Sequence, residues 1–559
     1  MVSPYLSKKK NESLTVSLPI KKIFQAVYRQ KEKGGDTSGE DETKIVVSEL
    51  ISKLTFFYEK IRNYVDYNEE HLHRKNAIKR ILKRHLVIES AVVRESAEDL
   101  SRNLLCELIR AGYLPNNKIP EKKIDDVKLV LEKYIKLRQL AMPHGLAEQM
   151  EKIIDKEKRE FSDWLLGIAA SEIESTLEIN KIGELVVGNI YEYLSGNVRL
   201  PINFAGYEKD LPIQIFLSVH RTHLKYDESM LSYLLFKYYN AQWWLPQNED
   251  IEKIAKNISL LRAAISQQLN HPLVRQLDKI TNRYSVFYSI LTDMISEDPV
   301  ALYENIKNKP EVFSSLAKEQ FTQRFEKAKS RLWRAGINSI IYIFITKSIF
   351  VLALEVPATR YFGQPLDYLA LTANMLFPPF LLFLVIMFTK VSSEENNKKV
   401  VAGVEEITFE EKHRHDPIVL RKPTRRNPIV SFIFNILYSL TFLISFGAVV
   451  WVLNKFNFTW VSTVIFLFFL VFVSFFSILI RRNVRRLVVV EERENLLNFI
   501  LDFFFIPITV VGKWISHKFS KINVFMFVMD FIIEAPFKVL VSIAEQWTRY
   551  VRERKEDIE

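Results

Sequence analysis

Apolar residues recur at steps of three and four positions through much of the first 330 residues. The pattern is clearest between Val47 and Val65 and between Ile124 and Ile135, where the apolar positions share one helical face. Similar spacing continues through residues 147–179, 212–240, 251–269 and 271–295. Because an amphipathic helix needs a partner surface for its apolar face, the pattern predicts a bundle of packed helices.

Two prolines predict helix starts near the end of this region. Pro299 follows Asp298, and Pro310 follows Lys309. Proline is tolerated at the first position of a helix because the amide there has no partner within the helix. By contrast, residues 30–40 form a polar run with three glycines, which predicts a linker and a flexible N-terminal segment over residues 1–42.

The chain becomes far more apolar after Trp333. Four segments are each about long enough to cross a hydrocarbon core of about 30 Å. They are residues 337–354, 369–388, 429–453 and 458–480. The last two contain no charged residue, a pattern that core helices of soluble proteins rarely show. Together they predict a polytopic α-helical membrane domain over residues 331–486.

Lysine and arginine residues gather on one side of these segments. They precede the first segment (324–334), fill the loop between the second and third (390–426) and follow the fourth (481–486). Basic loops stay on the cytoplasmic side of a membrane, and the N-terminus lacks the apolar stretch of a signal peptide. We therefore expect an integral protein of a bacterial inner membrane with both termini cytoplasmic.

Two further apolar stretches follow in the tail, residues 487–559, but they carry charge. Asp502 lies in the first stretch, and Asp530 and Glu534 lie in the second. Charged groups are costly near the centre of a bilayer, so we predict an amphipathic tail that is interfacial or re-entrant. The alternative is a six-span protein in which these three carboxylates enter the bilayer.

Composition agrees with a helical protein and narrows the possible chemistry. Only 15 of the 559 residues are glycine, which disfavours sandwiches, barrels and glycine-loop nucleotide folds. The single cysteine, Cys106, excludes intrachain disulfides and CxxC sites. The expected fold class is all-α, with a cytosolic N-terminal helical bundle over residues 43–330 followed by the membrane domain.

Complete catalytic and metal-binding motifs are missing from the sequence. The GxxxxG spacings that begin at Gly34 and Gly183 lack the lysine that reaches a phosphate in nucleotide-binding loops. The HExxH, GxSxG and EF-hand patterns are also absent. We therefore expect no cofactor and no bound metal, and a non-enzymatic role is favoured over an enzyme.

Three polar residues in or beside the first two apolar segments are candidates for a function within the membrane. Lys347 is the one charge well inside a segment, Glu355 lies near the same helical face, and Asn374 precedes Pro378–Pro379. An ionisable group within a membrane marks a functional site by default. The prolines suggest a helix break that lines a polar path. The alternatives are that Lys347 extends to the membrane surface and that the prolines only kink a packed helix.

Residues 73–85 form the densest basic stretch before the membrane segments. On a helix they present Arg74, Lys75, Lys79, Arg80, Lys83 and Arg84 beside an apolar edge. Such a face is most often simply solvated, but clustered basic groups also bind anionic lipid headgroups. The formal net charge of +11 is compatible with nucleic acid as well. Because no nucleic-acid motif accompanies the stretch, anionic lipid is the favoured partner and nucleic acid is disfavoured.

Three functions fit these features. The first is a membrane-anchored scaffold or envelope-organising protein whose cytosolic domain binds protein partners or a second copy. The second is a small transporter or channel with a polar path around the first two membrane segments. The third is lipid-binding membrane remodelling by the tail and the basic helix. The size of the helical domain and the short external loops favour the scaffold.

Overall fold

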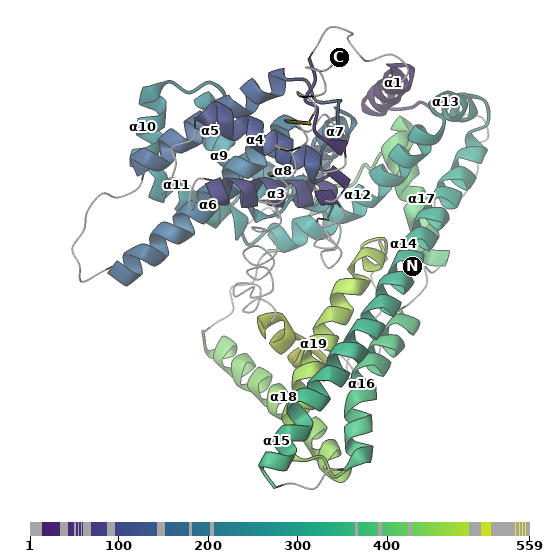
Figure 1. Cartoon of the computed structure of the whole chain (residues 1–559). Helices are drawn as coiled ribbons and strands as arrows, with labels where there is room; N and C mark the ends of the chain where they lie inside the picture. Colours follow the sequence, from purple (N-terminus) through teal and green to yellow (C-terminus); the bar gives the residue numbers. More distant parts are fainter. Residues whose placement is uncertain are drawn as a thin grey trace. The chain divides into compact units, whose positions relative to one another are not determined.

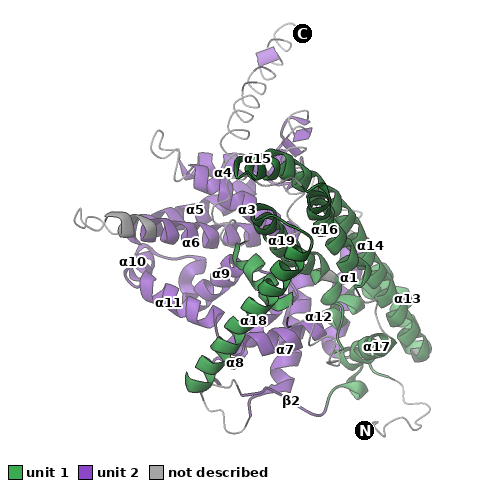
Figure 2. Ribbon diagram, turned by 90° about the horizontal axis from the view of Figure 1, so that it is seen from below, with its two compact units in different colours: residues 1–17, 286–414, 423–529 green, residues 18–285, 415–422, 530–559 purple. Residues whose placement is uncertain are grey.

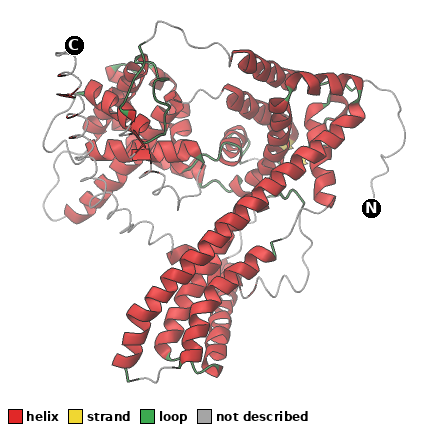
Figure 3. Cartoon of the chain, turned by 45° about the vertical axis from the view of Figure 1, so that its right-hand side comes forward, coloured by secondary structure: helices red, strands yellow, loops and turns green. Residues whose placement is uncertain are grey.

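The secondary structure is almost entirely helical. The computed structural model describes residues 14–33, 43–49, 69–85, 96–141, 151–177, 181–201, 206–363, 367–389, 394–422, 428–490 and 505–515, together with isolated positions elsewhere. Within them, one pair of two-residue strands is the only sheet (Figures 1 and 3). The predicted all-α fold class is therefore confirmed.

The chain divides into two units, each built from segments that are far apart in the sequence (Figure 2). Unit 1 comprises residues 1–17, 286–414 and 423–529, and unit 2 comprises residues 18–285, 415–422 and 530–559. Residues 286–330 thus belong with the apolar helices and not with the N-terminal bundle. One physical reason is that the ring of Phe287 packs onto Gly403, where an added Cβ would lie 2.2 Å from the ring.

The amphipathic segments form the helices of unit 2. These are α1 (Leu18–Lys33), α3 (Glu70–Lys83), α4 (Ala97–Arg110), α5 (Lys122–Ala141), α6 (Glu151–Leu177), α7 (Lys181–Asn197), α8 (Leu211–Thr222), α9 (Glu228–Tyr239), the 3₁₀ turn η4 (Ala241–Trp244), α10 (Asn248–Lys256) and α11 (Ile258–Leu269). Helix α12 (Val274–Glu297) begins in unit 2 and ends in unit 1. The strands β1 (Val198–Arg199) and β2 (Ile418–Val419) pair in parallel, which attaches residues 415–422 to unit 2.

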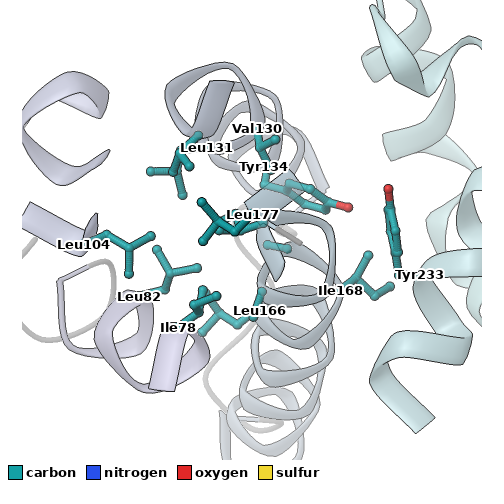
Figure 4. Packing of buried hydrophobic residues seen from close by; sticks show 14 of the residues in the cluster. Ile78, Leu82, Leu104, Val130, Leu131, Tyr134, Leu166, Ile168, Leu177 and Tyr233 are labelled. Carbon is teal, nitrogen blue, oxygen red and sulfur yellow. The ribbon is translucent and has the colours of Figure 1, made fainter. Parts of the chain in front are cut away.

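The core of unit 2 forms around α6, which packs against α3, α5 and α9. Figure 4 shows Ile78 and Leu82 of α3 beside Leu104 of α4 and Leu166 of α6, and all four side chains are buried. The two α3 residues are four positions apart, so they lie on the same side of the helix. The bundle of packed amphipathic helices is therefore present as the sequence pattern predicts.

A polar network is enclosed in this apolar core. The carboxylate of Glu172 on α6 accepts hydrogen bonds from Tyr134 Oη (2.8 Å) and Trp243 Nε1 (2.9 Å), and it pairs with Lys133. Lys133 Nζ also donates to the carbonyl of Trp243 (3.1 Å). Burial and the negative charge of Glu172 hold the pKa of Tyr134 well above its ordinary value. The network ties α5, α6 and η4 together.

Helix α1 corrects the expected flexible N-terminal segment. Residues 18–33 form a helix that packs against α7 and buries Ile20, Ile23 and Val27. These three residues are spaced by three and four positions, so they lie on one helical face. The polar run over residues 30–40 that suggested flexibility overlaps the last four residues of this helix, and its glycines begin at Gly34, after the helix has ended.

The described part of unit 1 contains the apolar helices and the shorter elements between them. These are α13 (Pro299–Asn308), α14 (Pro310–Phe350), the π-helical turn η5 (Val351–Glu355), α15 (Val356–Tyr361), α16 (Tyr368–Met387), α17 (Glu394–Thr408), the 3₁₀ turn η6 (Glu410–Lys412), α18 (Pro428–Lys455) and α19 (Trp460–Arg485). Both predicted proline starts are confirmed, since α13 begins at Pro299 and α14 begins at Pro310.

Among the described residues, four helical stretches are long and apolar enough to cross a membrane. They are residues 311–361, 368–387, 428–455 and 460–482, which overlap the four segments that hydropathy predicts almost completely. Helices α14, α16 and α19 run side by side (Figures 1 and 3). Large apolar side chains such as Phe432, Leu443 and Val464 are exposed on these stretches. Such surfaces suit contact with lipid, so the protein associates with a membrane.

Helix α14 is continuous over 41 residues, or about 60 Å. Its first half buries Phe313 and Phe321, and this half packs with α13 and α17. The ring of Phe313 meets the ring of Phe409, directly after α17, in an edge-on contact with 5.1 Å between centroids. The second half of α14 belongs to the first apolar stretch. One rigid element therefore joins the α17 region to the membrane helices.

Part of the tail packs against a membrane helix. Residues 505–515 form a short apolar helix, and Ile508 shares a buried cluster with Val471 of α19. A Cβ added at Gly512 would lie 2.4 Å from the carbonyl oxygen of Val471, so only glycine permits this approach. Val471 lies near the middle of α19. Residues 505–515 thus lie beside a membrane helix, and the interfacial, re-entrant and six-span arrangements of the whole tail stay predictions.

Candidate functional site

Lys347, Glu355 and Asn374 come together where α14, η5 and α16 meet. Asn374 Nδ2 donates to both oxygens of the Glu355 carboxylate, at 2.7 and 2.8 Å. All three side chains are fully buried, with 0% of their surface exposed. The candidate residues that the sequence suggests for the first two membrane segments therefore form one buried cluster.

The backbone that carries Glu355 is irregular. Pro357 has no amide hydrogen, so the carbonyl of Ala353 cannot receive the hydrogen bond that an α-helix would supply. Directly before this proline the chain widens into the π-helical turn η5, which ends at Glu355. Single π-helical turns within α-helices are frequent at functional sites. Glu355 thus projects from a locally widened helix.

The helix that carries Asn374 also loses backbone hydrogen bonds near the cluster. Helix α16 continues through Pro378 and Pro379, so the predicted helix break is not formed. Neither proline has an amide hydrogen, and the carbonyls of Asn374 and Met375 therefore lack their donor four residues on. These two carbonyls of α16 are therefore acceptors without an α-helical donor.

Lys347 is enclosed by the helices and does not extend to the membrane surface. Its Nζ lies 4.0 Å from the centre of the Phe469 ring on α19, a cation–π geometry. It is also close enough to Glu355 for their opposite charges to attract. The ammonium group has no hydrogen-bond partner within the described part of the chain. The predicted alternative of an extended, surface-seeking lysine is therefore wrong.

The cluster has a balanced charge and unused hydrogen-bonding capacity. One ammonium and one carboxylate give it no net charge, yet holding both ions in an apolar medium still costs on the order of several kcal/mol. Lys347 Nζ as donor and Asn374 Oδ1 as acceptor lack partners among the described residues. A buried pair of this kind can take up and release protons by changing its protonation state.

The six basic residues predicted to contact lipid, five on α3 and Arg84 directly after it, are paired with carboxylates of unit 2. The ion pairs join Arg74 to Glu174, Lys75 to Asp227, Lys79 and Lys83 to Asp163, Arg80 to Glu59, and Arg84 to Glu107. Burial alone would raise the pKa of Asp163, but the hydrogen bonds and charges of Lys79 and Lys83 lower it overall. The positive charge of α3 is thus balanced inside the unit, and contact with anionic lipid stays a prediction.

Three predicted residues lie outside the described part of the chain, and two features of the site were not predicted. Asp502, Asp530 and Glu534 lie outside the described residues, so their place in the tail stays a prediction. Phe469 was missed by sequence reasoning because it is one of many aromatic residues in an uninterrupted apolar segment. The irregular turn η5 had a readable signal, since Pro357 closely follows an apolar helical pattern.

The geometry of the buried cluster is the guide to function. Comparison with protein-family models, with curated proteins and with solved structures finds no match to this chain. Among the described residues, no group of three or more histidine, cysteine, aspartate or glutamate side chains could hold a metal ion.

Proposed function

We propose that this protein moves protons across a membrane, as a channel or as a proton-coupled transporter. The observation that carries the proposal is the fully buried pair of Lys347 and Glu355, with Asn374 bonded to the carboxylate. Ionisable groups between membrane helices are costly and mark ion pathways and proton relays. This observation moves transport ahead of the scaffold function that the sequence alone favours.

The charges of the cluster select protons over other ions. The ammonium of Lys347 repels metal cations, and the carboxylate of Glu355 repels anions. A proton can pass because each group accepts or releases it chemically and no wide opening is needed. For the topology we keep the arrangement that the basic loops predict, with both termini on the cytoplasmic side of a bacterial inner membrane.

Proton flux into proteoliposomes tests this function. With a potassium diffusion potential as driving force and a trapped pH-sensitive dye, the full chain is expected to carry protons faster than protein-free vesicles. Glu355→Gln should lower the flux at least about tenfold, because the amide cannot be protonated. The matched control is Glu395→Gln, which makes the same change on an exposed side chain at the start of α17. Equal flux from Glu355→Gln and wild type would contradict the proposal.

A scaffold function is the second candidate, and an exposed apolar patch on unit 2 favours it. Trp244 and Leu245 are 75% and 73% exposed, and Tyr238 at the end of α9 is 64% exposed. Lys237 Nζ lies 5.6 Å from the centre of the Trp244 ring. Exposed aromatic and aliphatic groups gathered in one place mark protein interaction sites. A second copy of the chain is the partner we propose, because most oligomers are symmetric assemblies of one chain.

Light scattering of the purified full chain in detergent tests self-association. The double variant Trp244→Ser/Leu245→Ser is expected to raise the dimer dissociation constant at least about tenfold, since hot-spot residues contribute about 2 kcal/mol or more each. Leu129→Ser is the control, because Leu129 is an exposed leucine on α5. A monomeric wild type, or dimerisation that survives the double variant, would exclude this surface.

A further inference from the structure

Helix α19 buries several hydroxyl side chains that the cluster does not use. Ser462, Thr463, Ser474 and Ser477 are 3%, 8%, 1% and 1% exposed, in a helix that is otherwise rich in phenylalanine, leucine, isoleucine and valine. Ser339 on α14 is also buried, at 7%. We call these five residues the hydroxyl ladder. The four on α19 lie on a helix that also buries Phe466 and Leu470, so hydroxyl and apolar side chains of α19 both face the neighbouring helices.

Aromatic contacts fix the register between α14 and α19. The ring of Phe350 meets the ring of Phe469, with centroids 5.4 Å apart, and Phe362 meets Trp460 at 4.9 Å. From Phe350 to Phe362 the residue numbers rise, while those of their partners fall from Phe469 to Trp460, so the two segments are antiparallel. Lys347, whose Nζ lies over Phe469, sets the central level of this register.

This register places the ladder at the depths that continue the charged cluster. Counting eight residues back from Lys347 and eight onward from Phe469 brings Ser339 and Ser477 to one level. Counting eight onward from Lys347 and seven back from Phe469 brings Glu355 and Ser462 to another. From Ser462 to Ser477 the helix rises about 22 Å of a hydrocarbon core of about 30 Å.

Unpaired polar atoms give a second, independent indication of a path. Ser474 Oγ and Lys347 Nζ are buried atoms that lack hydrogen-bond partners among the residues described here. Buried polar groups that meet no partner are costly in a medium without water. Along the helix axis, Ser474 lies about 7.5 Å from the level of Phe469. Each of the two atoms has the capacity to bind a water molecule.

We propose that the hydroxyl ladder and the Lys347–Glu355–Asn374 cluster form one proton path through the membrane domain. The inference rests on the proposed function and names the route and the species carried. Lys347 releases a proton to water on the Ser474 side, so an N–H bond breaks and an O–H bond of hydronium forms. A proton from the other side then binds the Glu355 carboxylate and passes through water to the amine, which restores the starting charges. The hydroxyl of Ser474 accepts one proton and donates another, and no oxidant or reductant is involved.

The test measures proton flux in the same proteoliposomes with the double variant Ser474→Ala/Ser477→Ala. We expect the flux to fall at least about tenfold, and Ser474→Thr, which keeps a hydroxyl, to retain most of it. Ser439→Ala is the control, because Ser439 is an exposed serine on the neighbouring span α18. The hydroxyl of Ser477 donates to the carbonyl of Ser474 within its own helix, so its loss should not disturb packing between helices. We therefore expect the variants to have the same thermal stability as wild type, which would show that folding is unchanged.

The outcomes separate the path from the function on which it rests. Wild-type flux from the double serine variant, with flux lost in Glu355→Gln, would overturn the ladder and leave proton transport standing. Flux that is unchanged in both variants, or absent from the wild type, would overturn the function and the path together. Loss of flux in both variants, with restoration by Ser474→Thr, would support the path.

Discussion

Replacing Glu172 with alanine is expected to destabilise the helical bundle of unit 2 by about 3–5 kcal/mol, the usual cost of removing one partner of a buried ion pair. The carboxylate serves three groups at once, because Lys133, Tyr134 and Trp243 all bond to it. Alanine would leave a buried ammonium without its counter-charge and two donors without their acceptor. Glu172→Gln keeps an acceptor oxygen but removes the charge, so it should cost less.

The single cysteine reports this change. Cys106 on α4 is partly buried and packs against the same core, so its labelling by a thiol reagent follows opening of the bundle. We expect Glu172→Ala to be labelled at a clearly lower temperature than wild type in a heating series. Glu160→Ala on the same helix is the control, since Glu160 is exposed and its loss should change stability by no more than about 0.5 kcal/mol. Identical labelling of wild type and Glu172→Ala would contradict the predicted role of the network.

The elements governed by local rules were predictable from the sequence. The four apolar stretches follow from hydrophobicity and length, and the starts of α13 and α14 follow from the chemistry of Pro299 and Pro310. Lys347 and Glu355 were identified for the same reason, because charge is conspicuous in an apolar segment. Each of these signals is carried by a few neighbouring residues.

The features that depend on distant partners were not predictable. The ion pairs of the basic face of α3 could not be predicted, because carboxylate partners such as Glu174 and Asp227 lie far along the chain. Helix α1 was missed because the prediction for the whole N-terminal segment rested on the polar run over residues 30–40. The buried hydroxyls of α19 gave no signal, since serine and threonine barely lower the hydropathy of a segment. Only packing shows which side of a helix is enclosed.

Neutralising Lys347 and Glu355 together should restore the stability that either single change removes. Lys347→Met leaves the buried carboxylate of Glu355 without its counter-charge. Glu355→Gln likewise leaves the buried ammonium of Lys347 without its counter-charge. Each single variant is therefore expected to lose about 3–5 kcal/mol. The double variant buries no charge, and its stability should lie within about 1 kcal/mol of wild type, since neutral replacements of buried pairs are often tolerated. The measurement is the thermal midpoint of the purified full chain in detergent for the four members of the cycle.

The same cycle, repeated with proton flux, separates a structural pair from a proton relay. If the pair only holds α14 and α16 together, the double variant should recover whatever transport the single variants lose. If the pair carries protons, the double variant should be stable and still fail to transport, because neither methionine nor glutamine can bind and release a proton at these positions. Recovery of both stability and flux would contradict the relay. Recovery of stability alone would place the proton chemistry on Lys347 and Glu355.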